Sequence, residues 1–190
     1  MNSVDPKALR KSRLFLLLIA LVFAAPMIVA GLLSWSGWQP GVKGHGEAIL
    51  PQRNFVDQKL RVQLADGQDY AWRASTPKLT LVALAGPGCA GRCMAALTGM
   101  AKARVMLNHN QKRLRLLYLG TPPAAATDLD AMRNYWQLGR DVDGRLAAFR
   151  PAGADSVSAV LVESNGTALS FYPTGFDVSG LLQDLQKVIK

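Results

Sequence analysis

The stretch from Lys78 to Leu107 constrains the fold of this chain more than any other. It opens with an apolar run at Leu79–Ala85, continues through Gly86-Pro87-Gly88, and then brings Cys89 and Cys93. A short apolar run bounded by turn residues indicates a buried strand, and the glycines permit a sharp turn after it. We therefore expect a core strand, a glycine turn, a cysteine pair and a helix, in this order.

Cys89 and Cys93 are the only two cysteines in the chain. Residues four apart on a helix share a face, and their Cα atoms lie about 6 Å apart, which is within the reach of a disulfide. The unpaired N–H groups and the dipole at a helix N-terminus favour a thiolate there. The pair is therefore predicted to be a redox dithiol, a soft-metal site, or both.

A second constraint is the run from Leu14 to Leu33, which contains no charged residue. It is about as long as the hydrocarbon core of a bilayer requires, and four basic residues precede it. We expect residues 14–34 to be a transmembrane anchor in a bacterial inner membrane, with residues 1–13 in the cytoplasm. The alternative is a signal peptide cleaved near Val22-Phe23-Ala24, which would export the same domain.

The rest of the chain is expected to form a tether at residues 35–49 and one periplasmic domain at residues 50–190. The net charge of +9 is uneven, because no acidic residue occurs from Tyr70 to Thr127. One interpretation is a basic surface for an acidic partner or for anionic lipid, and the other is ordinary solvated charge. For an exported domain tethered to a membrane, we expect no nucleic-acid partner.

Beyond the cysteine stretch, the sequence predicts alternating strands and helices. The expected elements are a β-hairpin over residues 60–72, the helix that ends near residue 107, a strand at 114–119, a helix at 128–138, a β-hairpin at 157–172 that turns at Asn165-Gly166, and a last helix capped by Asp177 or Ser179. This order is that of the α/β thioredoxin-like fold, here with an N-terminal β-hairpin and preceded by one transmembrane helix.

The segment Cys89-Ala90-Gly91-Arg92-Cys93, placed after Gly86-Pro87-Gly88, resembles the motif of the SCO/SenC family. These are membrane-anchored thioredoxin-fold proteins of cytochrome c oxidase assembly. They have one N-terminal anchor, a Cys-x-x-x-Cys motif after the first core strand, and a final hairpin and helix. The resemblance covers about residues 50–190, and the family's two prolines within and just after the motif are absent here.

The resemblance implies a copper site of two cysteines and a distant histidine, and it implies a respiratory oxidase subunit or another assembly factor as the partner. Cys89 and Cys93 match the two cysteines, whereas Asp155 stands at the position of the histidine. A carboxylate is a hard ligand and suits Cu(I) poorly. We therefore expect Cys89 and Cys93 to hold any Cu(I) as a two-coordinate dithiolate, with Asp155 as a poorly suited third ligand.

Three functions stay open at this point. The chain is a SCO-like assembly factor that handles thiols or Cu(I), a general periplasmic thiol–disulfide oxidoreductase, or a non-catalytic scaffold with a structural disulfide. Oxidoreductases usually have Cys-x-x-Cys and a proline directly before the strand that faces it, and this chain has neither. A disulfide that closes so short a loop stabilises a fold only modestly. The assembly factor is therefore favoured. As an enzyme the chain is at most a thiol–disulfide oxidoreductase, in which Cys89 attacks and Cys93 resolves.

Overall fold

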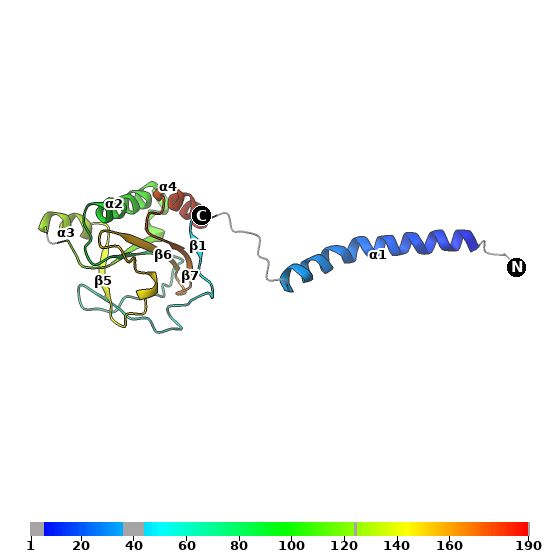
Figure 1. Cartoon of the computed structure of the whole chain (residues 1–190), viewed down its shortest axis with the longest axis horizontal. Coiled ribbons are helices and arrows are strands. Elements are labelled where there is room, and N and C mark those ends of the chain that lie inside the picture. Colours follow the sequence, from blue (N-terminus) through cyan, green and yellow to red (C-terminus); the bar gives the residue numbers. More distant parts are fainter. Residues whose placement is uncertain (1–5, 36–43, 124, 190) are drawn as a thin grey trace. The chain divides into compact units, whose positions relative to one another are not determined.

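The structure is a computed structural model that describes residues 6–35, 44–123 and 125–189. The chain divides into two compact units, Met1–Lys43 and Gly44–Lys190. The described part of the first unit is the helix α1 (Pro6–Trp35), labelled in Figure 1. Within the described residues, no helix meets the length and apolarity that crossing a membrane requires. Most of the expected tether, residues 36–43, lies outside the described residues.

The second unit is built on one mixed sheet with the strand order β1-β7-β6-β3-β4-β5-β2. The central strands β3, β4 and β5 run parallel, whereas β6 is antiparallel to β3 and β2 is antiparallel to β5. Strands β7 and β1 continue the antiparallel pairing beyond β6. The strands are β1 (Glu47–Ala48), β2 (Val62–Leu64), β3 (Leu79–Ala85), β4 (Leu114–Leu119), β5 (Gln137–Asp141), β6 (Val157–Glu163) and β7 (Ala168–Tyr172).

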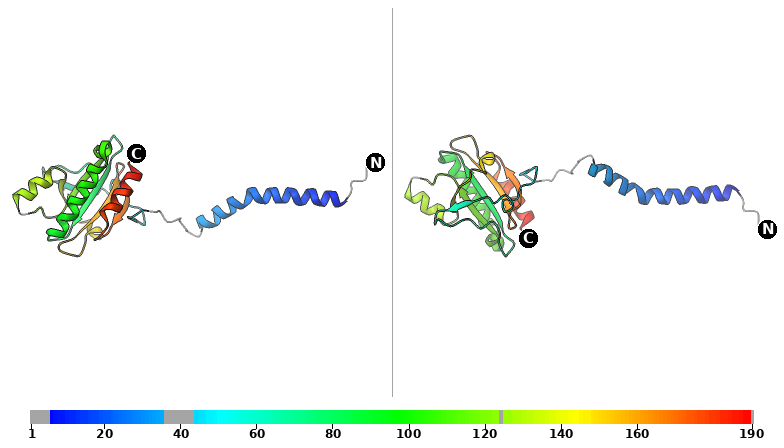
Figure 2. Two further views of the ribbon diagram at one scale, coloured as in Figure 1. Left: turned by 90° about the horizontal axis from the view of Figure 1, so that it is seen from above. Right: turned by 90° about the horizontal axis from the view of Figure 1, so that it is seen from below.

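Helices cover one face of this sheet. The helices are α2 (Gly91–Met106), α3 (Ala126–Arg133) and α4 (Val178–Val188), with short 3-10 segments η1 (Asn108–Arg113) and η2 (Ala147–Phe149). Helices α2 and α4 contact each other and lie side by side over the strands, as Figure 2 shows. The β3-α2-β4 segment is thus a parallel crossover unit, which places the start of α2 at the carboxyl end of β3.

Two apolar cores lie on the two faces of the sheet. In β3, Leu81 and Ala83 join the core beneath the helices, whereas Val82 and Leu84 join the core on the other face. Aromatic residues of the long segment before β3, such as Trp72, fill that second core. Because β3 is buried on both faces, it reads in the sequence as a continuous apolar run.

Several predicted elements are confirmed. Strands β3 and β4 have the expected bounds, and β6 and β7 form the expected hairpin, in which Gly166 adopts a φ of 92°. Such a backbone conformation favours glycine. Of the two candidate caps of the last helix, Asp177 is the one used, because its carboxylate accepts from the N–H groups of Ser179 and Gly180.

The predicted helix at residues 128–138 is wrong in its second half. Helix α3 ends at Arg133, and the following residues form β5. Only Leu138 of β5 is buried, so the segment has no apolar alternation that would indicate a strand. Its pairing with β4 and β2 makes it a strand.

The predicted hairpin over residues 60–72 is formed only in part. Its first arm is β2, but the return segment pairs with it through a single bridge between Gln63 and Asp69. The main partner of β2 is β5. At the other edge of the sheet, β1 lies within the residues expected to be a tether, and it pairs with β7.

Candidate functional site

The cysteine pair lies where β3 gives way to α2. Cys89 precedes the helix, Ala90 is its N-cap residue, and Cys93 lies in its first turn. The two residues form a disulfide with a Cα–Cα distance of 5.2 Å. The expectation of two cysteines on one helical face was therefore wrong in detail, since only Cys93 is helical. The pair still meets at the helix start, as the sequence predicted.

The two sulfur-bearing side chains differ in exposure. Cys93 is fully buried against the core beneath the helices, whereas Cys89 is only partly buried. A partner molecule can therefore reach Cys89 without unfolding the domain, whereas Cys93 is shielded from solvent. The order of attack and resolution expected from the sequence stays a prediction, and the difference in exposure supplies a physical basis for testing it.

Asp155 binds the N-terminus of α2. Its carboxylate accepts hydrogen bonds from the N–H groups of Ala90 (2.8 Å), Arg92 (3.0 Å) and Cys93 (2.9 Å). Ala90 has no side chain that could cap the helix, so a residue from a distant loop supplies the cap. These N–H groups, led by that of Cys93, lower the pKa of Asp155 to about 2, and the Arg92 guanidinium 3.6 Å away adds to the effect.

The loop that presents Asp155 is held against the glycine turn. The N–H of Gly86 donates to Ser156 O (2.9 Å), and the N–H of Gly88 donates to Ala154 O (3.1 Å). A Cβ atom on Gly86 would lie 2.1 Å from Gly153 O, so only glycine fits at this position. The close approach of the two backbones brings Asp155 to the helix start.

The electrostatic consequence differs from the one expected. The helix start was expected to favour a thiolate, but its N–H groups bind the carboxylate of Asp155. The side chain of Arg92, which lies between the cysteines in sequence, is 87% exposed and pairs with the same carboxylate. A fixed negative charge at the helix N-terminus occupies the N–H groups and opposes the dipole that would otherwise stabilise a thiolate. The reduced site is therefore electrostatically less favourable to a thiolate than a bare helix start.

The donor set does not fit the copper site that the SCO/SenC resemblance implies. The cysteines are joined to each other, and the carboxylate of Asp155 is engaged by three backbone donors. His45 lies against α4 and His109 lies in η1 at the far end of α2. Across residues 6–35, 44–123 and 125–189, no group of three or more His, Cys, Asp or Glu side chains is placed to hold a metal ion.

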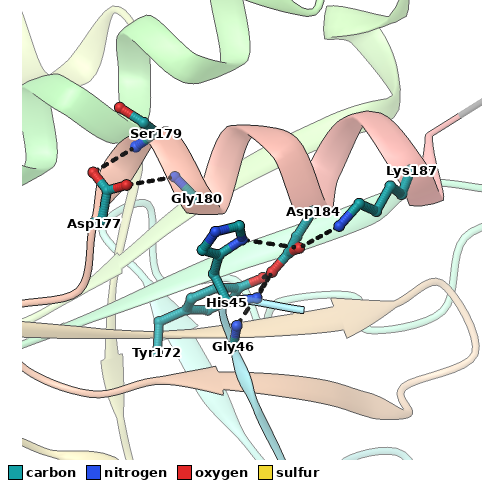
Figure 3. A network of polar contacts seen from close by, with 8 residues as sticks. All are labelled: His45, Gly46, Tyr172, Asp177, Ser179, Gly180, Asp184 and Lys187. Carbon is teal, nitrogen blue, oxygen red and sulfur yellow. Dashed lines mark hydrogen bonds and ion pairs between the residues drawn. The ribbon is translucent and has the colours of Figure 1, made fainter. Parts of the chain in front are cut away.

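A second polar network, drawn in Figure 3, was missed by the sequence analysis. The buried carboxylate of Asp184 on α4 accepts from the N–H groups of His45 (2.6 Å) and Gly46 (3.2 Å) and from the hydroxyl of Tyr172 (3.2 Å). Burial raises the pKa of Asp184, but the N–H groups of His45 and Gly46 and further hydrogen bonds leave it below its usual value. His45, expected to be a solvated tether residue, is thus fixed to the domain.

Comparison with protein families gives one match. The family model described as "Transmembrane-like, thioredoxin-like, C-terminal domain" matches residues 79–190. The match begins at β3 and covers the cysteine pair, Asp155 and all of α4. Comparison with the curated proteins finds no match to the chain.

Solved structures of thioredoxin-like proteins resemble the chain at low sequence identity. ScoI of Arabidopsis thaliana, solved with copper bound, aligns over 67% of this chain and 94% of its own, with a TM-score of 0.51 and 14% identity. BsSco, a member of the Sco family of cytochrome c oxidase assembly proteins, aligns over 80% and 99%, with a TM-score of 0.47 and 15% identity. Peroxiredoxin Q of Xanthomonas campestris aligns over 76% and 97%, with a TM-score of 0.49 and 14% identity. The likeness to ScoI supports the α/β thioredoxin-like fold.

Proposed function

The chain belongs to the family of transmembrane-like, thioredoxin-like C-terminal domains, and from this premise we propose that it exchanges disulfides with a partner protein through Cys89 and Cys93. The observation that supports this most is the disulfide at the head of α2, in which Cys89 is partly exposed and Cys93 is buried. The attacking thiol must be accessible to a partner, whereas the resolving thiol need only reach its neighbour.

The exchange begins from the reduced pair. The Cys89 thiolate attacks a disulfide of the partner, which forms a mixed disulfide and releases one partner thiolate. Cys93, after losing its proton to solvent, attacks the sulfur of Cys89 and releases the second partner thiolate. The partner gains two electrons, the Cys89–Cys93 disulfide re-forms, and an external dithiol reductant returns the pair to its starting state. The same steps in reverse oxidise a partner dithiol.

The setting that we propose is a bacterial inner membrane, with the domain in the periplasm. The uncharged run from Leu14 to Leu33 lies entirely within α1, and large side chains on it are exposed, among them Phe23 and Met27. The basic residues before this run favour a cytoplasmic N-terminus. The periplasm is oxidising, so a cysteine pair can persist there as a disulfide.

The partner that we propose is a thiol-bearing respiratory oxidase subunit or assembly factor. This part of the proposal rests on the resemblance of the Cys-x-x-x-Cys turn to that of the SCO/SenC family. Since the donor set around Cys89 and Cys93 lacks an imidazole, the proposed chemistry is thiol exchange and no step passes through copper.

A trapping experiment tests the exchange. The full chain in detergent, with Cys93→Ser, is mixed with a small aromatic disulfide, and the adduct is measured by mass spectrometry. We expect a stable mixed disulfide on Cys89, because the resolving thiol is gone. The matched Cys89→Ser variant should react at least about tenfold more slowly, because Cys93 is buried. Equal rates in the two variants would contradict the assigned roles, a faster reaction of Cys89→Ser would reverse them, and no adduct in either variant would remove the proposal.

The scaffold alternative predicts a different result. If the disulfide is only structural, the reduced pair should show no exchange with a dithiol–disulfide buffer. We expect a folded domain in both redox states, with a measurable equilibrium between them. Circular dichroism of the reduced and oxidised full chain, beside redox titration, distinguishes the two.

A further inference from the structure

We propose that one end of the domain rests on a surface of anionic phospholipid. This end, called the basic end below, has the side chains of Lys78, Arg104, Lys112 and Arg113. The inference rests on the membrane anchor proposed above and adds the face with which the domain meets the lipid. It gives a role to the stretch without acidic residues between Tyr70 and Thr127.

The parallel pairing of β3 and β4 creates the basic end. Leu79 lies opposite Leu114, so the residues just before them, Lys78 and Arg113, are neighbours at the amino ends of the two strands. Both line one shallow pocket. Glu163 is the acidic residue in the lining of that pocket, and it accepts a hydrogen bond from Asn165.

The end of α2 adds two more cations. Arg104 donates from Nε to Gln111 O (3.2 Å) and Leu114 O (2.9 Å), which holds its guanidinium where η1 leads into β4. Lys112 is exposed in η1. Among the ion pairs of the described residues, none involves Lys78 or any of the other three cations of the basic end. Their charge is thus not neutralised within the described part of the domain.

The chain from the proposed anchor joins the domain close to the basic end. The His45 ring packs against Gly180, and Asp184 lies one turn nearer the C-terminus of α4 (Figure 3). Gly44 lies against Asp184. Gly44, the first described residue of the second unit, therefore lies on the C-terminal half of α4, which ends at the C-cap residue Ile189. There, Ile189 O accepts from the side chain of Asn110 in η1, and Ile189 lines the pocket shared by Lys78 and Arg113.

The length of the connection limits how far the basic end can lie from a bilayer. Residues 36–43 separate α1 from Gly44, and even a fully extended chain of that length spans no more than about 30 Å. The disulfide lies at the opposite end of β3, about 20 Å along the strand from Lys78. Lipid contact at the basic end would therefore point Cys89 away from the membrane.

The chemistry favours lipid as the occupant. Anionic headgroups attract clustered Lys and Arg side chains, and the attraction fades within a Debye length. A connection of about this length allows the basic end to come within that distance of the bilayer that holds the proposed anchor. An acidic protein partner would need no such proximity, and it serves as an outcome of the test.

The test measures the reactivity of lysine amines in the reconstituted full chain. The chain is placed in vesicles of phosphatidylcholine alone, or in vesicles in which a third of the lipid is phosphatidylglycerol, and is acetylated and analysed by mass spectrometry. We expect Lys78 and Lys112 to react about threefold more slowly on the anionic vesicles, and high salt should abolish the difference. Arg113→Glu should weaken this protection, whereas the matched reversal Arg140→Glu, at an exposed site on β5, should preserve it.

The outcomes separate this inference from the proposals on which it rests. In one outcome, the chain floats with both kinds of vesicle while Lys78 and Lys112 react equally on each. This result overturns the lipid contact and leaves the anchor in place. Failure to float with either overturns the anchor and the contact together. Polyglutamate can also be added to the chain in phosphatidylcholine vesicles. If it slows the acetylation of Lys78 and Lys112 as much as phosphatidylglycerol does, the lipid assignment is overturned in favour of an acidic protein. The trapping of Cys89 in detergent is independent of all three results.

Discussion

Asp155 illustrates how one side chain can change the chemistry of a site through the backbone groups that it binds. The carboxylate stands where the resemblance to the SCO/SenC family places a histidine, and it uses its oxygens to bind the backbone at the start of α2. A group in this position stabilises the helix start and keeps negative charge beside the cysteine pair. Both effects can be measured separately.

The first effect of Asp155 concerns the reactivity of Cys89. In Asp155→Asn the negative charge is removed, so the thiolate of Cys89 in the reduced chain should be more stable. We expect alkylation of Cys89 at pH 7 to become about three- to tenfold faster. Asp143→Asn, an exposed carboxylate distant in sequence, is the control and should leave the rate unchanged. Faster labelling of buried Cys93 as well would indicate general loosening and contradict the electrostatic explanation.

The second effect of Asp155 is a dependence of stability on pH. Its native pKa of about 2 lies below the ordinary value for aspartate, near 3.9. The ionised carboxylate therefore stabilises the native state fully above about pH 5, and this contribution is lost as the pH falls from about 4 to 2. Thermal unfolding of wild type and Asp155→Asn should show a higher melting temperature for wild type at pH 7 and a much smaller difference near pH 2. A difference that stays constant over this range would rule out the carboxylate cap as its source.

At the scale of elements, two contacts distant in sequence organise the domain. The first joins the turn after β3 to the loop before β6, and it depends on the absence of a side chain at Gly86. The second joins the segment before β1 to α4 through Asp184. Each contact positions a segment that has little regular structure of its own.

Gly86→Ala should displace the loop that presents Asp155. The added methyl group would meet the carbonyl oxygens of Gly153 and Ala154, at 2.1 and 2.7 Å. Because the conflict is with backbone atoms, we expect a loss of about 1–3 kcal/mol in the free energy of unfolding. Gly88→Ala is the matched control, since its nearest contact would be an ordinary 3.8 Å. Denaturant titration of both variants measures the difference, and equal stabilities would contradict this account of Gly86.

Asp184→Ala should release the segment before β1 from α4. The N–H groups of His45 and Gly46 and the hydroxyl of Tyr172 would lose their acceptor in a buried place. We expect a cost of about 2–3 kcal/mol in the free energy of unfolding, together with faster proteolysis between residues 44 and 49. Asp143→Ala should change neither quantity. Unchanged proteolysis in Asp184→Ala would show that other contacts hold the segment.

At the scale of the whole molecule, the sequence was sufficient for the centre of the fold and insufficient for its edges. Strands β3 and β4 and the cysteine turn were predictable because burial on both faces leaves an apolar run, and the turn residues that bound it are local. Strand β5 was not predictable, because its residues show no alternation of apolar side chains. The segment is a strand because it pairs with β4 and β2.

The candidate site divides in the same way. Cys89 and Cys93 were identified from spacing alone, whereas the role of Asp155 depends on backbone groups more than sixty residues away. The contact of His45 with Asp184 bridges most of the domain's length. Contacts of this kind cannot be predicted from the sequence, because the two segments become neighbours only when the sheet has formed.

The cap on α2 also has a meaning for the evolution of the site. In the genetic code, every aspartate codon becomes a histidine codon through a single base change. A mutation of that kind at position 155 would exchange the carboxylate that caps the helix start for an imidazole, the side chain that the resemblance to the SCO/SenC family places there. A lineage with this fold is therefore one base change away from losing or gaining the carboxylate cap of α2.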